Sequence, residues 1–126
     1  MGVEVLREVD LFAGVAVSDF DSAVAWFERL LGEPATFVAH DTEYVWTLAE
    51  HRSINVDLRP ERAGYAMVTV FVDDLDGFVE AAAVRGIEPE TRETYGNGVR
   101  KVIYRDLDGN EIGFGGAPVE DAADGP

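Results

Sequence analysis

The chain has no cysteine and only two histidines, His40 and His51. The absence of cysteine excludes disulfides, thiolate metal sites and cysteine nucleophiles. Both histidines stand beside turns, where a lone histidine is ordinarily solvated. An unconventional metal site made of His40, Glu43 and His51 stays open as an alternative.

Basic residues and long apolar runs are also scarce. No segment approaches the length of a membrane-spanning helix, and residues 1–10 carry three acids instead of the apolar run of a signal peptide. We therefore expect a cytoplasmic protein without membrane association. Ten bases stand against 25 acids, a net charge of −15. Such a field repels phosphates, which argues against nucleic acid as a partner, and it attracts cationic small molecules.

The chain is nevertheless ordinary in its apolar content. Apolar residues make up 47% of its 126 positions, enough for one hydrophobic core without covalent cross-links. We expect a single domain over residues 1–116. Residues 117–126 are rich in Pro, Ala, Asp and Gly and are predicted to form a flexible acidic tail.

A repeat organises the domain. The segment Val17-Ser18-Asp19-Phe20-Asp21 recurs 55 residues later as Val72-Asp73-Asp74-Leu75-Asp76. Each copy follows a strand-like run and precedes a helix-like run, predicted at about 21–31 and 76–85. Aspartates at the start of each helix and a glycine at its end, Gly32 or Gly86, are typical of helix caps.

Strand-like segments complete each copy. They are predicted at 11–17, 35–39, 43–49 and 53–58, and again at 66–72, 88–95, 99–105 and 111–114. The order strand, helix, three strands thus occurs twice, over about 11–58 and 65–115. Because each sheet has a bare apolar face, we expect an α+β fold in which tandem βαβββ modules form curved mixed sheets around a cavity. That cavity could be closed within one chain or by a second chain.

These segments resemble the motifs of the vicinal oxygen chelate family, which includes glyoxalase I, extradiol dioxygenases, fosfomycin-resistance enzymes and bleomycin-resistance proteins. The resemblance rests on the two repeated segments and on the run Tyr104-Arg105-Asp106-Leu107-Asp108-Gly109-Asn110. That run is similar to the family's Arg-Asp-Pro-Asp-Gly-Asn turn, with Leu107 in place of the proline. The resemblance spans most of the chain and implies the tandem βαβββ fold, while activity varies widely on this scaffold.

The resemblance also implies where a metal ion would be held. Metal-dependent members use His, Glu or Gln at four strand positions, which correspond here to Phe12, about Asn55, Met67 and Gly113. Only Asn55 offers an oxygen, and an amide oxygen is a weak ligand. A one-residue shift of register restores no ligand, so we expect no metal and no cofactor.

The same positions predict a binding pocket. We expect the ligand to contact strand residues that face the cavity: Phe12, Gly14, Trp46, Asn55, Met67, Thr69, Glu111 and Gly113. Large apolar side chains beside glycines favour a flat apolar or aromatic ligand, and Glu111 or Asp57 could pair with a cation. In the other interpretation Phe12 and Met67 simply fill the cavity as core residues.

The hypothesis is therefore a metal-free, homodimeric protein that binds drug-like cationic or aromatic small molecules, similar to bleomycin-resistance proteins. No pairing of a nucleophile with a histidine and no distinctive pair of carboxylates indicates catalysis, so the sequence favours a protein that is not an enzyme and names no catalytic residue. Two alternatives remain open. One is a metal-dependent enzyme of the glyoxalase or dioxygenase type, and the other is a degenerate module with a structural or regulatory role.

Overall fold

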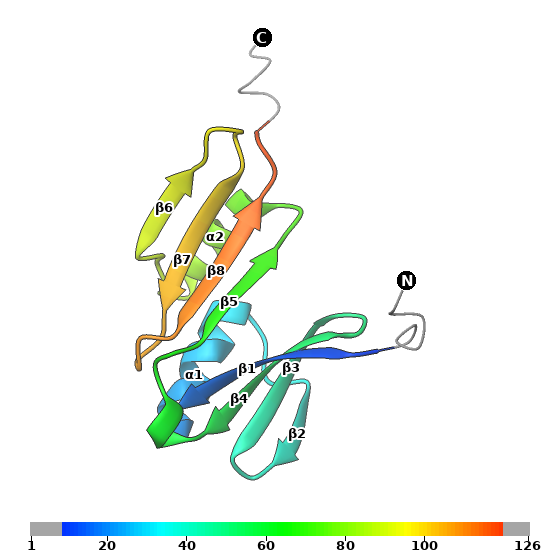
Figure 1. Cartoon of the computed structure of the whole chain (residues 1–126), viewed down its shortest axis with the longest axis vertical. Coiled ribbons are helices and arrows are strands. Elements are labelled where there is room, and N and C mark those ends of the chain that lie inside the picture. The colour runs from blue at the N-terminus through cyan, green and yellow to red at the C-terminus, as the bar shows by residue number, and fades with distance from the viewer. Residues whose placement is uncertain (1–8, 120–126) are drawn as a thin grey trace.

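The computed structural model describes residues 9–119, so most of the predicted tail at 117–126 lies outside the described residues. Each half of the chain forms one βαβββ module (Figure 1). The first module contains β1 (Leu11–Val17), α1 (Phe20–Leu31), β2 (Phe37–His40), β3 (Glu43–Ala49) and β4 (Arg52–Leu58). The second contains β5 (Met67–Phe71), α2 (Leu75–Val84), β6 (Thr91–Thr94), β7 (Arg100–Arg105) and β8 (Glu111–Gly116), and the short 3₁₀ helix η2 (Pro60–Arg62) links the two.

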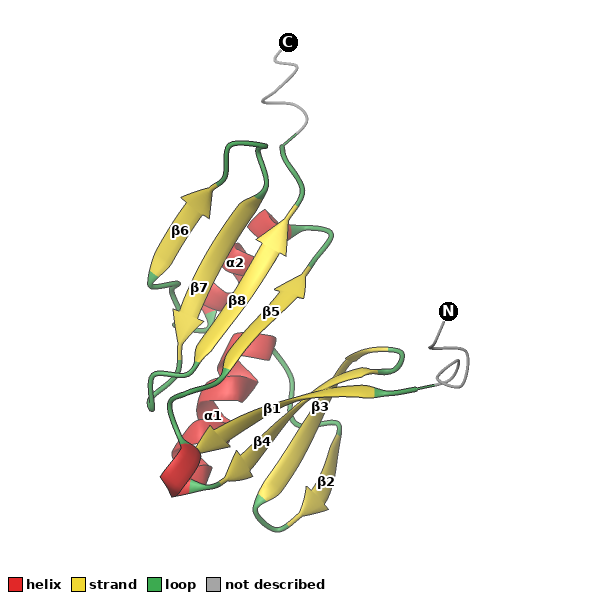
Figure 2. Cartoon of the chain, in the orientation of Figure 1, coloured by secondary structure: helices red, strands yellow, loops and turns green. Residues whose placement is uncertain are grey.

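Two four-stranded mixed sheets result, with the strand orders β1-β4-β3-β2 and β5-β8-β7-β6. The outer strands β1 and β5 pair in parallel with β4 and β8, and the other pairs are antiparallel. Both helices lie behind the sheets in Figure 2, so each sheet has one face covered by a helix. We call the uncovered face of each sheet its open face. The α+β class and the tandem modules predicted from the repeat are confirmed.

The core lies between the helices and the covered faces of the sheets. Alternate residues of each strand enter it, as the period of a strand requires. On β1 these are Val15 and Val17, at most 1% exposed, and on β8 they are Ile112 and Phe114. A continuous set of aromatic and aliphatic side chains from both modules surrounds them. Among the described residues, no helix has the length and apolar character to cross a membrane.

The capping aspartates and glycines act as predicted. Asp19 accepts a hydrogen bond from the amide of Ser22, and Asp74 accepts one from Gly77, which satisfies a free amide at each helix start. Gly32 ends α1 with φ 86°, a conformation that glycine adopts without strain. The strand β6 is shorter than the predicted 88–95: it begins after Pro89, which has no amide hydrogen to donate to a sheet, and it ends before Tyr95, whose amide donates to Val99 across the next turn.

A polar joint holds the two modules together. The fully buried Asn110 donates its Nδ2 to the carbonyl of Ala16 in β1, and Asp108 accepts hydrogen bonds from Ser18. Burial raises the pKa of Asp106, although its carboxylate accepts hydrogen bonds from Asn110 and Asp108. At the other end of the joint, the guanidinium of Arg85 donates to carbonyls in the last turn of α1, which caps that helix from the second module.

Tyr104 lies fully buried in this core, and its hydroxyl has no hydrogen-bond partner among the described residues. We expect Tyr104→Phe to raise the free energy of unfolding by about 1 kcal/mol, because the change removes an unpaired buried polar group and keeps the ring. Urea titrations at neutral pH check this result. A variant less stable than the wild type would show that the hydroxyl has a partner.

The stability difference between these two proteins should also depend on pH. Burial raises the pKa of Tyr104 above its ordinary value. The unfolded chain therefore ionises first, so the wild type loses stability as the pH rises above the ordinary tyrosine pKa of about 10. The phenylalanine variant lacks this loss, and its advantage over the wild type should grow above that pH.

Candidate functional site

The open faces of the two sheets are the surfaces on which the predicted ligand residues gather. On the first sheet, Phe12, Gly14 and Ala16 of β1 lie beside Ser53, Asn55 and Asp57 of β4. On the second, three rows cross the sheet: Met67 beside Glu111 and Arg105, Thr69 beside Gly113 and Ile103, and Phe71 beside Gly115 and Lys101. The neighbouring residues of these strands point to the covered faces and enter the core.

Seven of the eight predicted ligand residues are on these open faces. Gly14 and Asn55 are directly paired across β1 and β4, with Phe12 two residues before Gly14. On the second sheet Met67 pairs with Glu111 and Thr69 pairs with Gly113, which brings these four together.

Trp46 does not belong to either open face, which corrects its predicted place beside the others. It pairs with Ile54 in β4, a core residue, and is only 1% exposed. Its ring packs against Phe27 of α1 at a centroid distance of 5.9 Å, and its Nε1 donates to the carbonyl of Glu33 at 2.9 Å. Trp46 therefore stabilises the covered side of the first sheet.

Five of the eight predicted ligand residues line neither of the two hollows between the modules: Phe12, Asn55, Met67, Glu111 and Gly113. The sheets lie one above the other in Figure 1, and no strand of one pairs with a strand of the other. Two hollows lie between the modules. One, of about 570 Å³, is lined by residues of both modules and includes Trp46, Ser53, Thr69 and Phe71. The other, of about 370 Å³, lies over Gly14 and Ala16 on the open face of β1.

Several large apolar side chains are exposed on the open faces. Phe12 is 48% exposed, Met67 74% and Phe71 63%. Phe12 and Met67 therefore do not fill the site as core residues in this chain. The ring of Phe71 lies over Gly115, because a Cβ at residue 115 would be 3.0 Å from the ring carbon Cδ1. Apolar groups are thus available to a ligand on both sheets.

The carboxylates of the open faces are already engaged. On the first sheet Glu43 accepts from Asn55 at 2.9 Å, and Asp57 accepts from Arg59 at 2.7 Å. That contact raises the pKa of Arg59.

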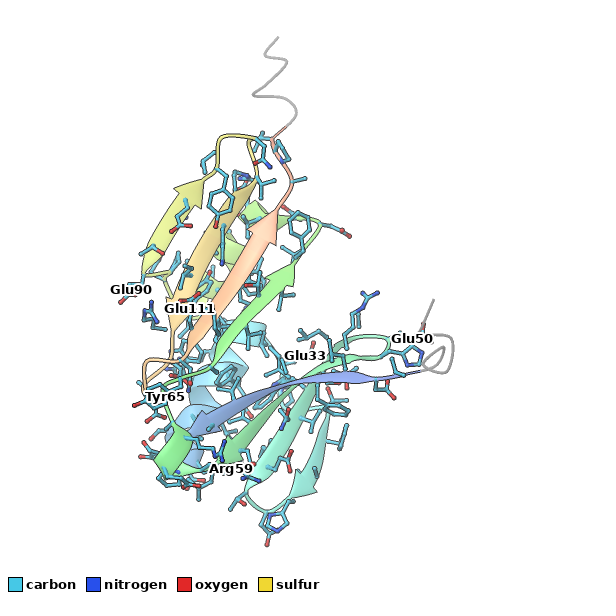
Figure 3. All side chains as sticks on the ribbon, viewed as in Figure 1. Glu33, Glu50, Arg59, Tyr65, Glu90 and Glu111 are labelled. Atoms are coloured by element: carbon cyan, nitrogen blue, oxygen red, sulfur yellow. The ribbon has the colours of Figure 1, made fainter. Side chains whose placement is uncertain are left out.

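On the second sheet Arg105 lies 2.8 Å from Glu90 and 3.4 Å from Glu111. Figure 3 shows Glu90 and Glu111 at the same end of this sheet. Glu111 and Asp57, the predicted partners of a cationic ligand, are therefore paired with arginines.

Lys101 is a feature of the open face that the sequence analysis missed. Its Cε lies over Gly113, at 2.8 Å from the point that a Cβ of residue 113 would occupy. The Oγ1 of Thr69 is 3.6 Å from the same point. The register of β7 and β8 could have revealed this neighbour, since a strand residue opposite Gly115 shares the face of Gly113.

The four positions at which the family resemblance leads us to expect metal ligands do not suit a metal ion here. They carry two apolar side chains, Phe12 and Met67, one amide, Asn55, and the bare Gly113. Within residues 9–119 no three histidine, aspartate or glutamate side chains are grouped closely enough to hold an ion.

The alternative site of His40, Glu43 and His51 is not assembled. His40 contacts Thr42, while His51 pairs with Asp10 at 2.8 Å.

Comparisons with known proteins agree with this architecture. A family model described as the Glyoxalase/Bleomycin resistance protein/Dioxygenase superfamily matches residues 9–114. A solved glyoxalase/bleomycin resistance protein from Catenulispora acidiphila DSM 44928 is 53% identical, with a TM-score of 0.86 over 88% of this chain and 100% of that one. A search of curated proteins finds no match.

Two more distant solved structures share the fold. The bleomycin resistance determinant encoded on transposon Tn5 is 20% identical, with a TM-score of 0.73 over 89% of this chain and 100% of that one. A bleomycin-binding protein in complex with bleomycin is 19% identical, with a TM-score of 0.71 over 86% of this chain and 98% of that one. At these identities the likeness concerns the fold alone.

Proposed function

Because the chain belongs to the glyoxalase/bleomycin resistance protein/dioxygenase superfamily, we propose that it binds a flat, largely apolar small molecule on its open faces without a metal ion. One observation carries the proposal: Phe12, Met67 and Phe71 are exposed on the same faces as Gly14, Gly113 and Gly115. Large rings beside bare backbone leave room for a planar molecule to stack.

The residues at the metal positions support a binder rather than a metal-dependent enzyme. Phenylalanine, methionine and glycine supply no ligand atom that zinc, manganese or iron prefers, and Asn55 already donates to Glu43. A protein with this fold binds bleomycin, which supports the use of the scaffold to hold a small molecule. The proposal therefore assigns binding and no chemical step.

The proposal includes a second copy of the chain. Neither hollow between the modules of one chain takes in Phe12, Met67 or Glu111, so one chain alone does not enclose these side chains. A homodimer in which the first sheet of one protomer meets the second sheet of its partner would enclose both sets of apolar side chains. It would also cover side chains as exposed as Met67 and Phe71.

A neutral fluorescent probe, N-phenyl-1-naphthylamine, tests the binding. We expect Phe12→Ala and Phe71→Ala each to weaken its affinity about tenfold, since each removes one stacking ring from the site. Leu107→Ala is the matched control, because Leu107 is 67% exposed in the turn between β7 and β8 and belongs to no strand. Failure of the wild type to bind, or equal affinities in all three variants, would contradict the proposal. Competition with a panel of aromatic antibiotics then narrows the ligand class.

Mixing variants tests the shared site. If each site uses Phe12 of one protomer and Phe71 of the other, a heterodimer of the two variants contains one intact site and one doubly altered site. Heterodimers isolated from co-expressed Phe12→Ala and Phe71→Ala chains by two different tags should then regain tight binding at about half of their sites. A site built within one chain would show no recovery.

A further inference from the structure

Lys101 occupies an unusual place for its residue type. It is the only lysine of the chain, and it lies on the open face of β7, opposite Gly115. Its side chain reaches over Gly113 of β8, where its Cε is 2.8 Å from the point that a Cβ of residue 113 would occupy. Residue 113 corresponds to the last metal ligand of related enzymes. The glycine there makes room for the lysine.

The charge of Lys101 is also unmatched in its surroundings. Among the described residues no carboxylate lies within ion-pair distance of its ammonium, although Lys101 stands directly opposite Glu93 in β6. Glu93 instead accepts a hydrogen bond from the hydroxyl of Tyr95 at 3.1 Å. Two rows away, Arg105 and Glu111 pair with each other. The ammonium of Lys101, with three hydrogen-bond donors, therefore remains available on a face whose other charged side chains are paired.

From this geometry we propose that Lys101 takes the place of the family's metal ion and binds an anionic group of the ligand. The inference rests on the proposed binding function and narrows it to flat aromatic molecules that carry a carboxylate or a comparable single anion. A positive charge at this point disfavours a divalent cation and favours an anion.

The neighbours of Lys101 suit such a ligand. The hydroxyl of Thr69 lies beside the same point over Gly113 and can donate a second hydrogen bond to the anion. Phe71 flanks Lys101 in its own row, across Gly115. The face thus offers an aromatic platform with one cation beside it. Because the protein carries a net charge of −15, this local cation would be needed to hold an anion at all.

Two probes that differ by one anionic group test the inference. Anilinonaphthalene-1-sulfonate carries a sulfonate, and N-phenyl-1-naphthylamine has the same rings without it. We expect Lys101→Met to weaken binding of the sulfonate at least about tenfold and to change the affinity for the neutral probe by less than about twofold. Lys101→Arg should restore most of the sulfonate binding, because it restores the positive charge.

Arg92→Met is the matched control for net charge. Arg92 is on the same sheet but pairs with Val102, a core residue, so it belongs to the covered face. This variant loses one positive charge and should bind both probes as the wild type does. If Arg92→Met lost as much affinity for the sulfonate as Lys101→Met, the inference would be overturned. It would also be overturned if Lys101→Met lost the same factor of affinity for both probes. If the wild type did not bind the neutral probe, that result would instead refute the proposed function itself.

Discussion

Replacement of Asn110 by alanine is expected to lower the free energy of unfolding by about 4 kcal/mol, the size of effect seen when a buried hydrogen-bond network is broken. Asn110 is fully buried, and its Oδ1 accepts hydrogen bonds from the amides of Gly64 and Ala66. Its Nδ2 donates to the carbonyl of Ala16 and to Asp106. Alanine would leave these groups of both modules without a partner.

Asn97→Ala is the matched control for Asn110. Asn97 lies in an exposed turn, where its Oδ1 accepts one hydrogen bond from Val99, so its loss should cost less than about 1 kcal/mol. Urea unfolding of both variants, followed by circular dichroism, gives the comparison. If the Asn110 variant were as stable as the Asn97 variant, the polar joint would not hold the modules together.

Phe114→Ala and Phe71→Ala should separate stability from binding on one sheet. Phe114 faces the core, 2% exposed, and stacks on Phe78 at a centroid distance of 4.1 Å. Its loss should cost about 3–5 kcal/mol through the cavity it leaves. Phe71 faces the open side at 63% exposure, so its loss should cost less than about 1 kcal/mol and weaken binding of the neutral probe instead.

Both variants remove the same ring from neighbouring strands, so each serves as the control for the other. Urea unfolding measures stability, and fluorescence titration at a temperature where both are folded measures affinity. A large loss of stability in the Phe71 variant would show that the open face of the second sheet is part of the core. Unchanged affinity in that variant would remove Phe71 from the binding surface.

Much of the fold could be predicted because the determining signals are local. Asp19 and Asp74 are followed by helix-forming runs, and a cap acts within one turn of its own helix. The bounds of β1 and β3 were predicted correctly because turn residues flank them. One strand start was predicted too early: β6 was expected from residue 88 but begins at Thr91, after Pro89, which has no amide hydrogen to donate.

The site could be predicted only in part. Strand alternation tells which residues share a face of the sheet, but it does not tell which of the two faces is covered by the helix. Residues of β3 alternate between two apolar environments: Val45 on the open face and Trp46 on the covered face are each 1% exposed. Nothing local to β3 tells which of them faces the helix. The approach of Lys101 to Gly113 depends on how β7 pairs with β8, a long-range contact that single-residue patterns do not carry.

The central claim is that the open faces bind a flat molecule without a metal ion, and a single titration tests it most directly. The affinity of the wild type for N-phenyl-1-naphthylamine is measured after exhaustive dialysis against a chelator, and again after addition of zinc, nickel, manganese or ferrous ion. We predict dissociation constants that agree within about twofold under all conditions, as expected of a site without metal ligands. Binding that appears only when one of these ions is restored would contradict the account.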